Sequence, residues 1–177
     1  VTAICNEDWV CTYTGGRFTG LQLNSYISDL DRSVAAVENL ALQAYVMAEK
    51  EGHIQRKLAS VIGKGVKEIN LFSYGPGYGS FDNWAHSFSM VKGVAKFIRH
   101  LDKAEDVLYP GQPRNPEVAI MWSGSNEIWR EKEPTSFDSH KGDTLYNGHY
   151  IHFGLLHDHI PIDFIDEFEI EKGGLSK

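Results

Sequence analysis

The sequence predicts an α/β protein built around a parallel sheet, and three observations support this fold class. Short apolar segments of strand length alternate along the chain with longer segments in which apolar residues recur every three or four positions. Such alternation is typical of parallel sheets, in which a helix returns the chain from the end of one strand to the start of the next. The composition, with 42% hydrophobic and 23% charged residues, is that of a globular protein.

Three strands are expected in the first part of the chain, at residues 1–5, 42–48 and 67–74. Each is an apolar run that ends in polar or aromatic residues. Because β-α-β connections are right-handed, we predict that these strands are parallel and adjoin in that order, with their helices on the outside.

Helices are expected where apolar residues follow helical spacing. Residues 25–40 and 53–66 carry two such sets, and a longer helix follows the third strand. The apolar stripe of that longer helix is expected to pack against the sheet. The three sets are Ile27, Leu30, Val34 and Val37; Ile54, Leu58, Val61 and Ile62; and Trp84, Phe88, Val91, Ala95 and Ile98.

A proline-rich segment divides the chain. Residues 106–117 hold three of the six prolines, and this density of turn-forming residues marks a linker. We therefore expect a first domain over residues 1–108, a linker over 109–116 and a second domain over 117–177.

The second domain is expected to begin with a strand at residues 117–122. The polar segment 123–143 is interpreted as a long excursion without regular structure. Residues 144–159 are predicted to be a helix, and residues 160–167 a strand led by proline.

Charge and composition exclude some classes of partner. The net charge of -7 argues against nucleic acid, because phosphate binding depends on clustered positive charge. No apolar run approaches the roughly 18 residues of a membrane-spanning helix, and the N-terminus lacks the pattern of a signal peptide, so we expect a soluble protein that binds no membrane. Its compartment stays open. Cys5 and Cys11 match no zinc or redox spacing and are expected to be reduced.

The segment "FSYGPGYGSFDNW", residues 72–84, spans the end of the third strand. Its glycines have the spacing G-x-G-x-G, which matches neither the dinucleotide fingerprint nor the Walker loop, so no phosphate site is expected. A turn between the strand and the helix explains the glycines, but it does not explain the aromatic side chains around them. The aromatic and polar side chains around them are of the kind that stack on a pyranose ring and bind its hydroxyls. They are Tyr74, Tyr78, Phe81, Asp82, Asn83, Trp84 and His86.

Carboxylates follow the first two predicted strands. Glu7 and Asp8 precede Trp9, and Glu49 and Glu51 come at the end of the second strand. The carboxyl ends of parallel strands are where α/β enzymes place their catalytic groups. Strand ends also carry charge simply because they meet water. The recurrence of carboxylates and aromatics at three successive strand ends favours a functional site.

Two other patterns are less specific. Four histidines, at positions 149, 152, 157 and 159, include pairs with helical spacing, but no matched carboxylates or cysteines accompany them, so no metal site is expected. Ser123 follows a strand in "WSGSN" but lacks the G-x-S-x-G context of a nucleophile elbow. A small α/β hydrolase or amidotransferase-like enzyme that uses Ser123 and a downstream histidine stays open as an alternative.

Several segments together resemble bacterial β-galactosidase-like glycoside hydrolases. They are "EDW", "LQAYVMAE" and "KGVKEINLFSYGPGY" at the three strand ends, and "NPEVAIMWSGSNEIW" with "HDHIPIDFIDE" beyond the linker. These enzymes join a (β/α)8 barrel to a trimerisation domain of flavodoxin-like or amidotransferase-like fold. The resemblance implies that residues 1–108 are the last three β/α units of a TIM-barrel-like domain and that 117–177 begin the trimerisation domain. The chain would then be a fragment.

The resemblance also implies a retaining mechanism with two carboxylates. Glu49 has the place of the nucleophile, and Glu51 is its rival. No residue matches the acid/base, so the chain alone is expected to be inactive. The residues implied to bind the sugar are Glu7, Asp8, Trp9, Tyr74, Tyr78, Asp82, Asn83 and Trp84.

The implied ligand is a carbohydrate and the implied assembly is a homo-oligomer, with no cofactor and no metal. A non-catalytic binding or oligomerisation module stays open as a further alternative, in which the carboxylates at the strand ends are surface charge.

Overall fold

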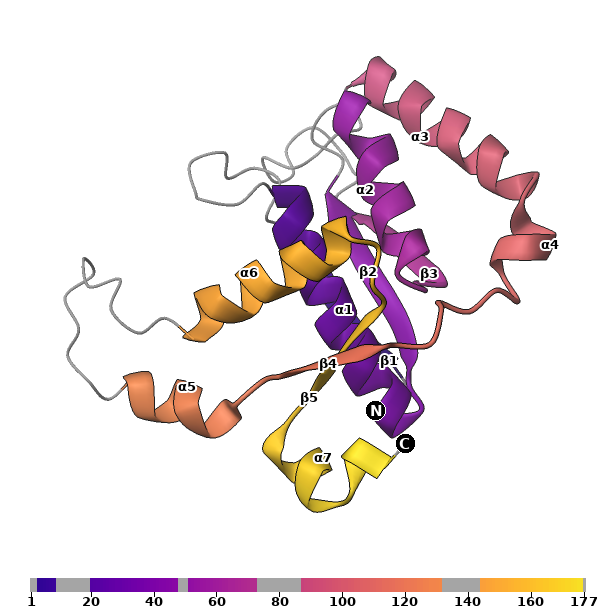
Figure 1. The fold of residues 1–177 in the computed structure, drawn as a ribbon. Helices are drawn as coiled ribbons and strands as arrows, with labels where there is room; N and C mark the ends of the chain where they lie inside the picture. Colours follow the sequence, from indigo (N-terminus) through magenta and orange to yellow (C-terminus); the bar gives the residue numbers. More distant parts are fainter. Residues whose placement is uncertain (1–2, 9–19, 48–50, 73–86, 132–143, 177) are drawn as a thin grey trace. The chain divides into compact units, whose positions relative to one another are not determined.

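The structure is a computed structural model that describes residues 3–8, 20–47, 51–72, 87–131 and 144–176. The chain forms two compact units, Val1–Arg114 and Asn115–Lys177, whose elements are shown in Figure 1. The division between the units falls inside the segment predicted to be a linker.

The first unit contains a three-stranded parallel sheet. Strands β1 (Ala3–Asp8), β2 (Ala41–Met47) and β3 (Glu68–Phe72) are arranged in the order β1-β2-β3. Both pairs are parallel. The predicted strands, their direction and their order are therefore confirmed.

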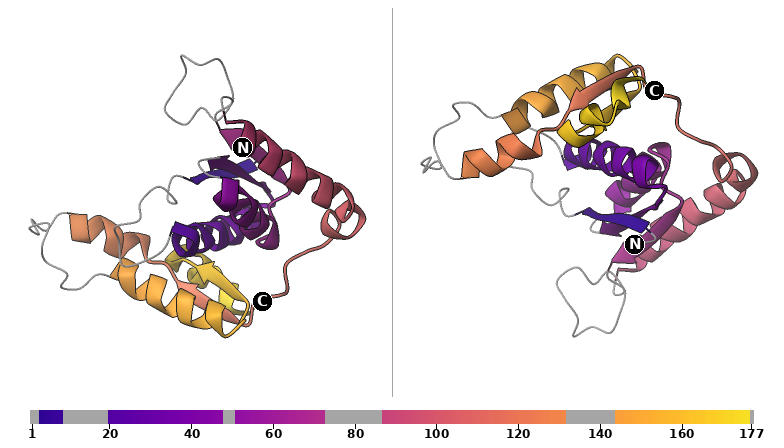
Figure 2. Two further views of the ribbon diagram at one scale, coloured as in Figure 1. Left: turned by 90° about the horizontal axis from the view of Figure 1, so that it is seen from above. Right: turned by 90° about the horizontal axis from the view of Figure 1, so that it is seen from below.

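Helices α1 (Gly20–Glu38) and α2 (Glu51–Gly63) lie on the same side of this sheet (Figure 2). Alternate residues of β2 are buried beneath them, as expected when one face of a strand packs against helices. Among the described residues of the first unit, a hydrophobic core is formed by Ala35, Leu42, Ala44, Val46, Ile54, Leu58, Val61, Val66, Met90 and Val94.

Helix α1 packs against the rest of the first unit through a face that carries polar side chains. Ser28 and Asp29 are buried, and Asn6 of β1 donates a hydrogen bond of 3.5 Å to Ser28. Asp29 accepts a hydrogen bond of 2.5 Å from Lys64, just after α2. The apolar residues that predicted this helix lie on another face, where Val34 and Val37 are exposed. The helix was predicted correctly, although its apolar stripe does not form the core.

Helix α3 (Phe88–Asp102) is followed by the short helix α4 (Glu105–Leu108). The Ser87 side chain caps α3 by accepting a hydrogen bond of 3.3 Å from the Met90 amide. Contrary to the predicted stripe, Phe88 and Ile98 are 71% and 53% exposed. The buried residues of α3 are Met90, Gly93 and Val94. Because α3 packs against α2 through these residues, the helix is rotated about its own axis relative to the orientation that the predicted stripe implies.

The second unit has a two-stranded parallel sheet of β4 (Val118–Met121) and β5 (Ile162–Ile165). Helix α6 (Thr144–His157) packs against both strands. The sheet and this helix agree with the sequence prediction. The buried residues of this unit include Ile120, Phe153, Ile162, Phe164 and Ile165.

Two helices of the second unit were not predicted. Helix α5 (Gly124–Glu131) lies at the start of the segment interpreted as a polar excursion, and α7 (Glu167–Glu171) follows β5 and precedes the 3-10 helix η2 (Gly174–Ser176). Both units are α/β with small parallel sheets. The barrel and the flavodoxin-like domain remain expectations from the resemblance.

Candidate functional site

The carboxyl ends of the three strands of the first unit meet at one edge of the sheet, which we call the carboxyl edge. Asp8, the last residue of β1, lies opposite Val46, and Met47, the last of β2, lies opposite Phe72, the last of β3. Helix α2 begins at Glu51, shortly after β2 ends, so its N-terminus lies near the same edge. The N-terminus of a helix carries partial positive charge and favours anions.

The structure describes only some of the predicted site residues. Glu7 and Asp8 are the last two residues of β1, and Glu51 is the first residue of α2, so all three belong to the carboxyl edge. The other predicted site residues lie outside the described residues; they are Trp9, Glu49, Tyr74, Tyr78, Phe81, Asp82, Asn83, Trp84 and His86.

Residues 7 and 8 are both expected to bind the sugar, but the strand register places their positions in different rows of the sheet. Position 7 is in a row with Tyr45 and Asn70, whereas position 8 is in a row with Val46 and Leu71. Tyr45 is 38% exposed and Val46 is 0% exposed. Because successive rows of a sheet face opposite sides, the row of Tyr45 and Asn70 faces away from the helices and the row of Val46 and Leu71 faces the core.

The face of the sheet away from the helices carries polar side chains. Gln43 donates a hydrogen bond of 2.6 Å to the Glu68 carboxylate on the neighbouring strand. Tyr45 and Cys5 are exposed on the same face, and Cys5 forms no disulfide with any described residue. Hydroxyl, amide and carboxylate groups of this kind can hydrogen-bond a polar ligand.

Lys57 on α2 is a residue of the carboxyl edge that the sequence analysis missed. Its side chain is 0% exposed, and its Nζ donates a hydrogen bond of 2.9 Å to the main-chain carbonyl of Met47, where β2 ends. The signal in the sequence was a lysine three residues after Ile54 and four before Val61, on the apolar stripe of the helix.

Ser123 in the second unit is the cap of α5. Its Oγ accepts a hydrogen bond of 3.1 Å from the Asn126 amide and donates one to the Glu167 carboxylate. The Gly124 amide donates a further hydrogen bond of 3.2 Å to Glu167. The hydrogen bond from Ser123 is the main cause that lowers the pKa of Glu167. Among the described residues, Ser123 therefore pairs with a carboxylate, whereas the hydrolase alternative requires a histidine beside it.

The histidines of α6 contribute to packing. His149 and His152 are buried, and their rings contact Phe153, while the ring of His152 also stacks on Phe164 at 6.0 Å. Within the described ranges, no group of three or more histidine, cysteine, aspartate or glutamate side chains could hold a metal ion.

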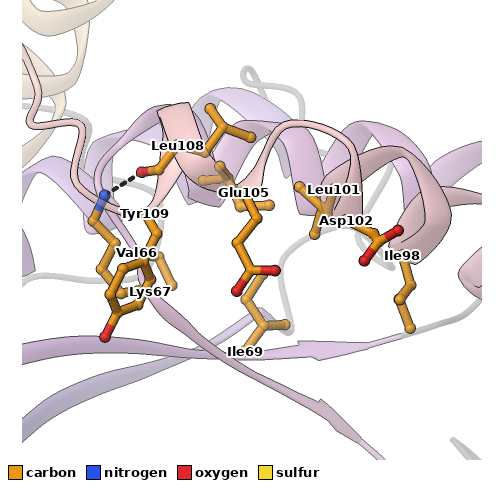
Figure 3. A pocket seen from close by; sticks show the side chains of 10 residues that line it. Val66, Lys67, Ile69, Ile98, Leu101, Asp102, Glu105, Leu108 and Tyr109 are labelled. Atoms are coloured by element: carbon orange, nitrogen blue, oxygen red, sulfur yellow. Dashed lines mark hydrogen bonds between the residues drawn. The ribbon is translucent and has the colours of Figure 1, made fainter.

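A hollow of about 310 Å³ lies beside β3 and is shown in Figure 3. Its apolar lining includes Ile69 and Leu101, with Lys67 and Tyr109 among its other lining residues. The Lys67 ammonium donates a hydrogen bond of 2.7 Å to the Leu108 carbonyl. Since Val66 and Lys67 precede β3, the hollow extends to the amino end of that strand, opposite the carboxyl edge.

Comparisons with known protein families, with curated proteins and with solved structures found no match to this chain. Among the described helices, none has the length and apolar character needed to cross a membrane.

Proposed function

We propose that this chain belongs to a glycoside hydrolase of the β-galactosidase-like type, which acts on a carbohydrate by a retaining two-carboxylate mechanism. One observation supports the proposal most strongly. The three parallel strands end at one edge of the sheet, and in the sequence these ends are followed by Trp9, Glu49 and Tyr74. Strand ends that meet at one edge are what a site built from successive β/α units requires.

In this mechanism Glu49 is the nucleophile. Its carboxylate attacks the anomeric carbon while the bond from that carbon to the leaving oxygen breaks, and a second carboxyl group protonates the leaving oxygen. Water then attacks the anomeric carbon and releases the sugar with retained configuration. In the sequence, Glu49 comes two residues before Glu51, where α2 begins, and the N-terminus of a helix favours negative charge nearby.

The acid/base residue is proposed to come from a part of the protein outside this chain, because no residue here matches it. The sugar is proposed to bind to Glu7 and to the aromatic residues after β1 and β3. The register favours position 7 over position 8, because position 7 is opposite Tyr45, which is exposed on the face away from the helices, where a barrel has its interior.

The second unit is proposed to be part of an oligomerisation domain. Met121 on β4 and Ile128 and Trp129 on α5 are exposed apolar side chains, and exposed apolar groups often mark protein interfaces. The expected assembly is a homo-oligomer.

The proposal is tested in the full-length protein with nitrophenyl glycosides as substrates. Glu49→Gln should lower kcat by several orders of magnitude, because an amide cannot attack the anomeric carbon. Glu51→Gln is the matched control and should cost only about tenfold. The 177-residue chain alone should show no turnover, since no residue in it matches the acid/base that the resemblance implies.

External azide gives a second test. A Glu49→Gly variant should regain turnover with azide and release a glycosyl azide of inverted configuration, because azide takes the place of the missing nucleophile. Near wild-type rates for Glu49→Gln would contradict this assignment. Carbohydrate binding without any turnover by the full-length protein would favour the non-catalytic module.

A further inference from the structure

The hollow of about 310 Å³ beside β3 has a largely apolar lining. Its apolar residues are Ile62, Val66, Ile69, Ile98, Leu101 and Leu108. Ile98 is 53% exposed and Leu108 is 39% exposed, although covering apolar surface is favourable. The volume of the hollow is at the low end of the range of small-molecule sites. The hollow is therefore suited to a small ligand with an apolar part.

Two carboxylates line the same hollow. Asp102 is the last residue of α3, and Glu105 is the first residue of α4. In Figure 3 the Glu105 side chain extends from α4 toward Ile69 on β3, and the Asp102 carboxylate lies on the same side of the helices. Neither side chain forms an ion pair or a hydrogen bond with another described residue. Two negative charges at the hollow are thus without a cation among the described residues.

The charged and aromatic groups at the hollow favour a positively charged ligand. Lys67 also lines it, but its ammonium donates hydrogen bonds of 2.7 and 2.5 Å to the carbonyls of Leu108 and Gly111. An anion would approach two carboxylates, whereas a cation would meet charges of the opposite sign. Tyr109 lines the hollow as well, and aromatic rings attract cations to their faces.

We propose that this hollow binds a small organic cation in which an ammonium group is attached to an apolar chain or ring. The apolar part packs against Ile69, Ile98 and Leu101, and the ammonium group lies beside the carboxylates of Asp102 and Glu105. The inference is independent of the glycosidase proposal, because none of these residues belongs to the carboxyl edge.

Titrations of the 177-residue chain with three probes test the preference for positive charge. Hexylammonium, hexan-1-ol and hexanoate share an apolar chain and differ in the charge of the end group. NMR signals of the methyl groups of Ile69, Ile98 and Leu101 should shift during the titration. Hexylammonium should bind at least about threefold more tightly than hexan-1-ol, and hexanoate should bind most weakly. Equal affinities for the three probes, or shifts confined to methyl groups outside the hollow, would overturn the proposal.

Variants at exposed positions test the two carboxylates. Asp102→Asn combined with Glu105→Gln should weaken hexylammonium binding about 3- to 10-fold and leave hexan-1-ol binding within about twofold of wild type. Asp106→Asn is the control, because Asp106 follows Glu105 on α4 and does not line the hollow. It should change both affinities by less than about twofold. Unchanged hexylammonium binding in the combined variant would contradict the role of the carboxylates.

The same titration of the full-length protein shows whether the hollow is accessible there. Hexylammonium should bind with an affinity within about threefold of that for the 177-residue chain. Loss of binding in the full-length protein would show that another part of the protein covers the hollow, and it would overturn the proposal. The result for Glu49→Gln leaves this test unaffected, so the two proposals fail separately.

Discussion

Pro113 lies so close to Gly65 that a Cβ atom at position 65 would come within 2.8 Å of the Pro113 Cγ. Gly65 also has a φ of +93°, which favours glycine. Two residues after Gly65, Lys67 donates hydrogen bonds to the carbonyls of Leu108 and Gly111, at 2.7 and 2.5 Å. The first part of the linker is therefore attached to the first unit at the turn between α2 and β3.

Gly65→Ala should destabilise the chain by about 1–3 kcal/mol, because it combines a strained backbone with a clash against Pro113. Gly63→Ala is the matched control. A Cβ at position 63 meets nothing within 4 Å, so this variant should be neutral or slightly stabilising. Urea unfolding of the two variants measures the difference, and equal stabilities would contradict the described turn.

Burial raises the pKa of Asp31 from 3.8 to about 6. Between these values the folded state holds a proton that the unfolded state has lost. The free energy of unfolding should therefore fall as the pH rises from about 4 to about 6, and this contribution should then level off. Because solvent screens a partly buried carboxyl group, we expect a decrease of about 1–2 kcal/mol.

Chemical unfolding between pH 4 and pH 7 tests this expectation for Asp31. Asp31→Asn should reduce the dependence on pH and stabilise the chain at pH 7. The same pH dependence in wild type and Asp31→Asn would show that another group is responsible.

Ser123→Ala should have two effects in the second unit. Loss of the cap should destabilise α5 by about 1 kcal/mol. The pKa of Glu167 should rise toward its usual value of 4.5, because the main cause of its lowering is lost. An NMR titration of the Glu167 carboxyl carbon measures the second effect. Ser125→Ala, at an exposed position of the same helix, should change neither quantity.

The same Ser123→Ala variant bears on the hydrolase alternative. The glycosidase proposal predicts that glycoside hydrolysis by the full-length protein is unaffected. Loss of a hydrolytic activity in Ser123→Ala, with the fold intact, would favour a serine nucleophile.

Positions 7 and 8 should differ in their effect on sugar binding. In the full-length protein, Glu7→Gln should lower kcat/KM by at least about tenfold, because a charge-assisted hydrogen bond to a sugar hydroxyl is lost. Asp8→Asn should cost less than about threefold, since position 8 is in register with Val46, which is fully buried. Kinetics with one nitrophenyl glycoside measure both. The opposite order would show that the register does not select the residue that binds the sugar.

The sheet of the first unit could be predicted from the sequence because its strands are apolar runs separated by helical segments. Sequential strands usually adjoin and their connections are right-handed, which together favour the order β1-β2-β3 found here. The buried face of α1 could not be predicted in the same way. Its polar residues are stabilised by Asn6 and Lys64, which are far away in the sequence, so hydrophobic spacing does not reveal them.

Two features were missed because their residues are polar. Helix α5 begins in a segment whose composition resembles a loop, and its cap depends on Glu167, 44 residues beyond Ser123. Lys57 was overlooked because a lysine is normally exposed, and only the fold shows the Met47 carbonyl within its reach. The edge of the candidate site was predicted from the strand ends, whereas the roles of its residues came from the resemblance.

Covalent labelling of the full-length protein tests the central claim most directly. An activated 2-deoxy-2-fluoro glycoside should form a long-lived glycosyl-enzyme ester, because loss of the 2-hydroxyl slows the hydrolysis of the intermediate. Mass spectrometry of the digested protein should locate the sugar on Glu49, and Glu49→Gln should abolish the label. A sugar attached to Glu51 or to another carboxylate, or an active enzyme that accumulates no label, would contradict the account.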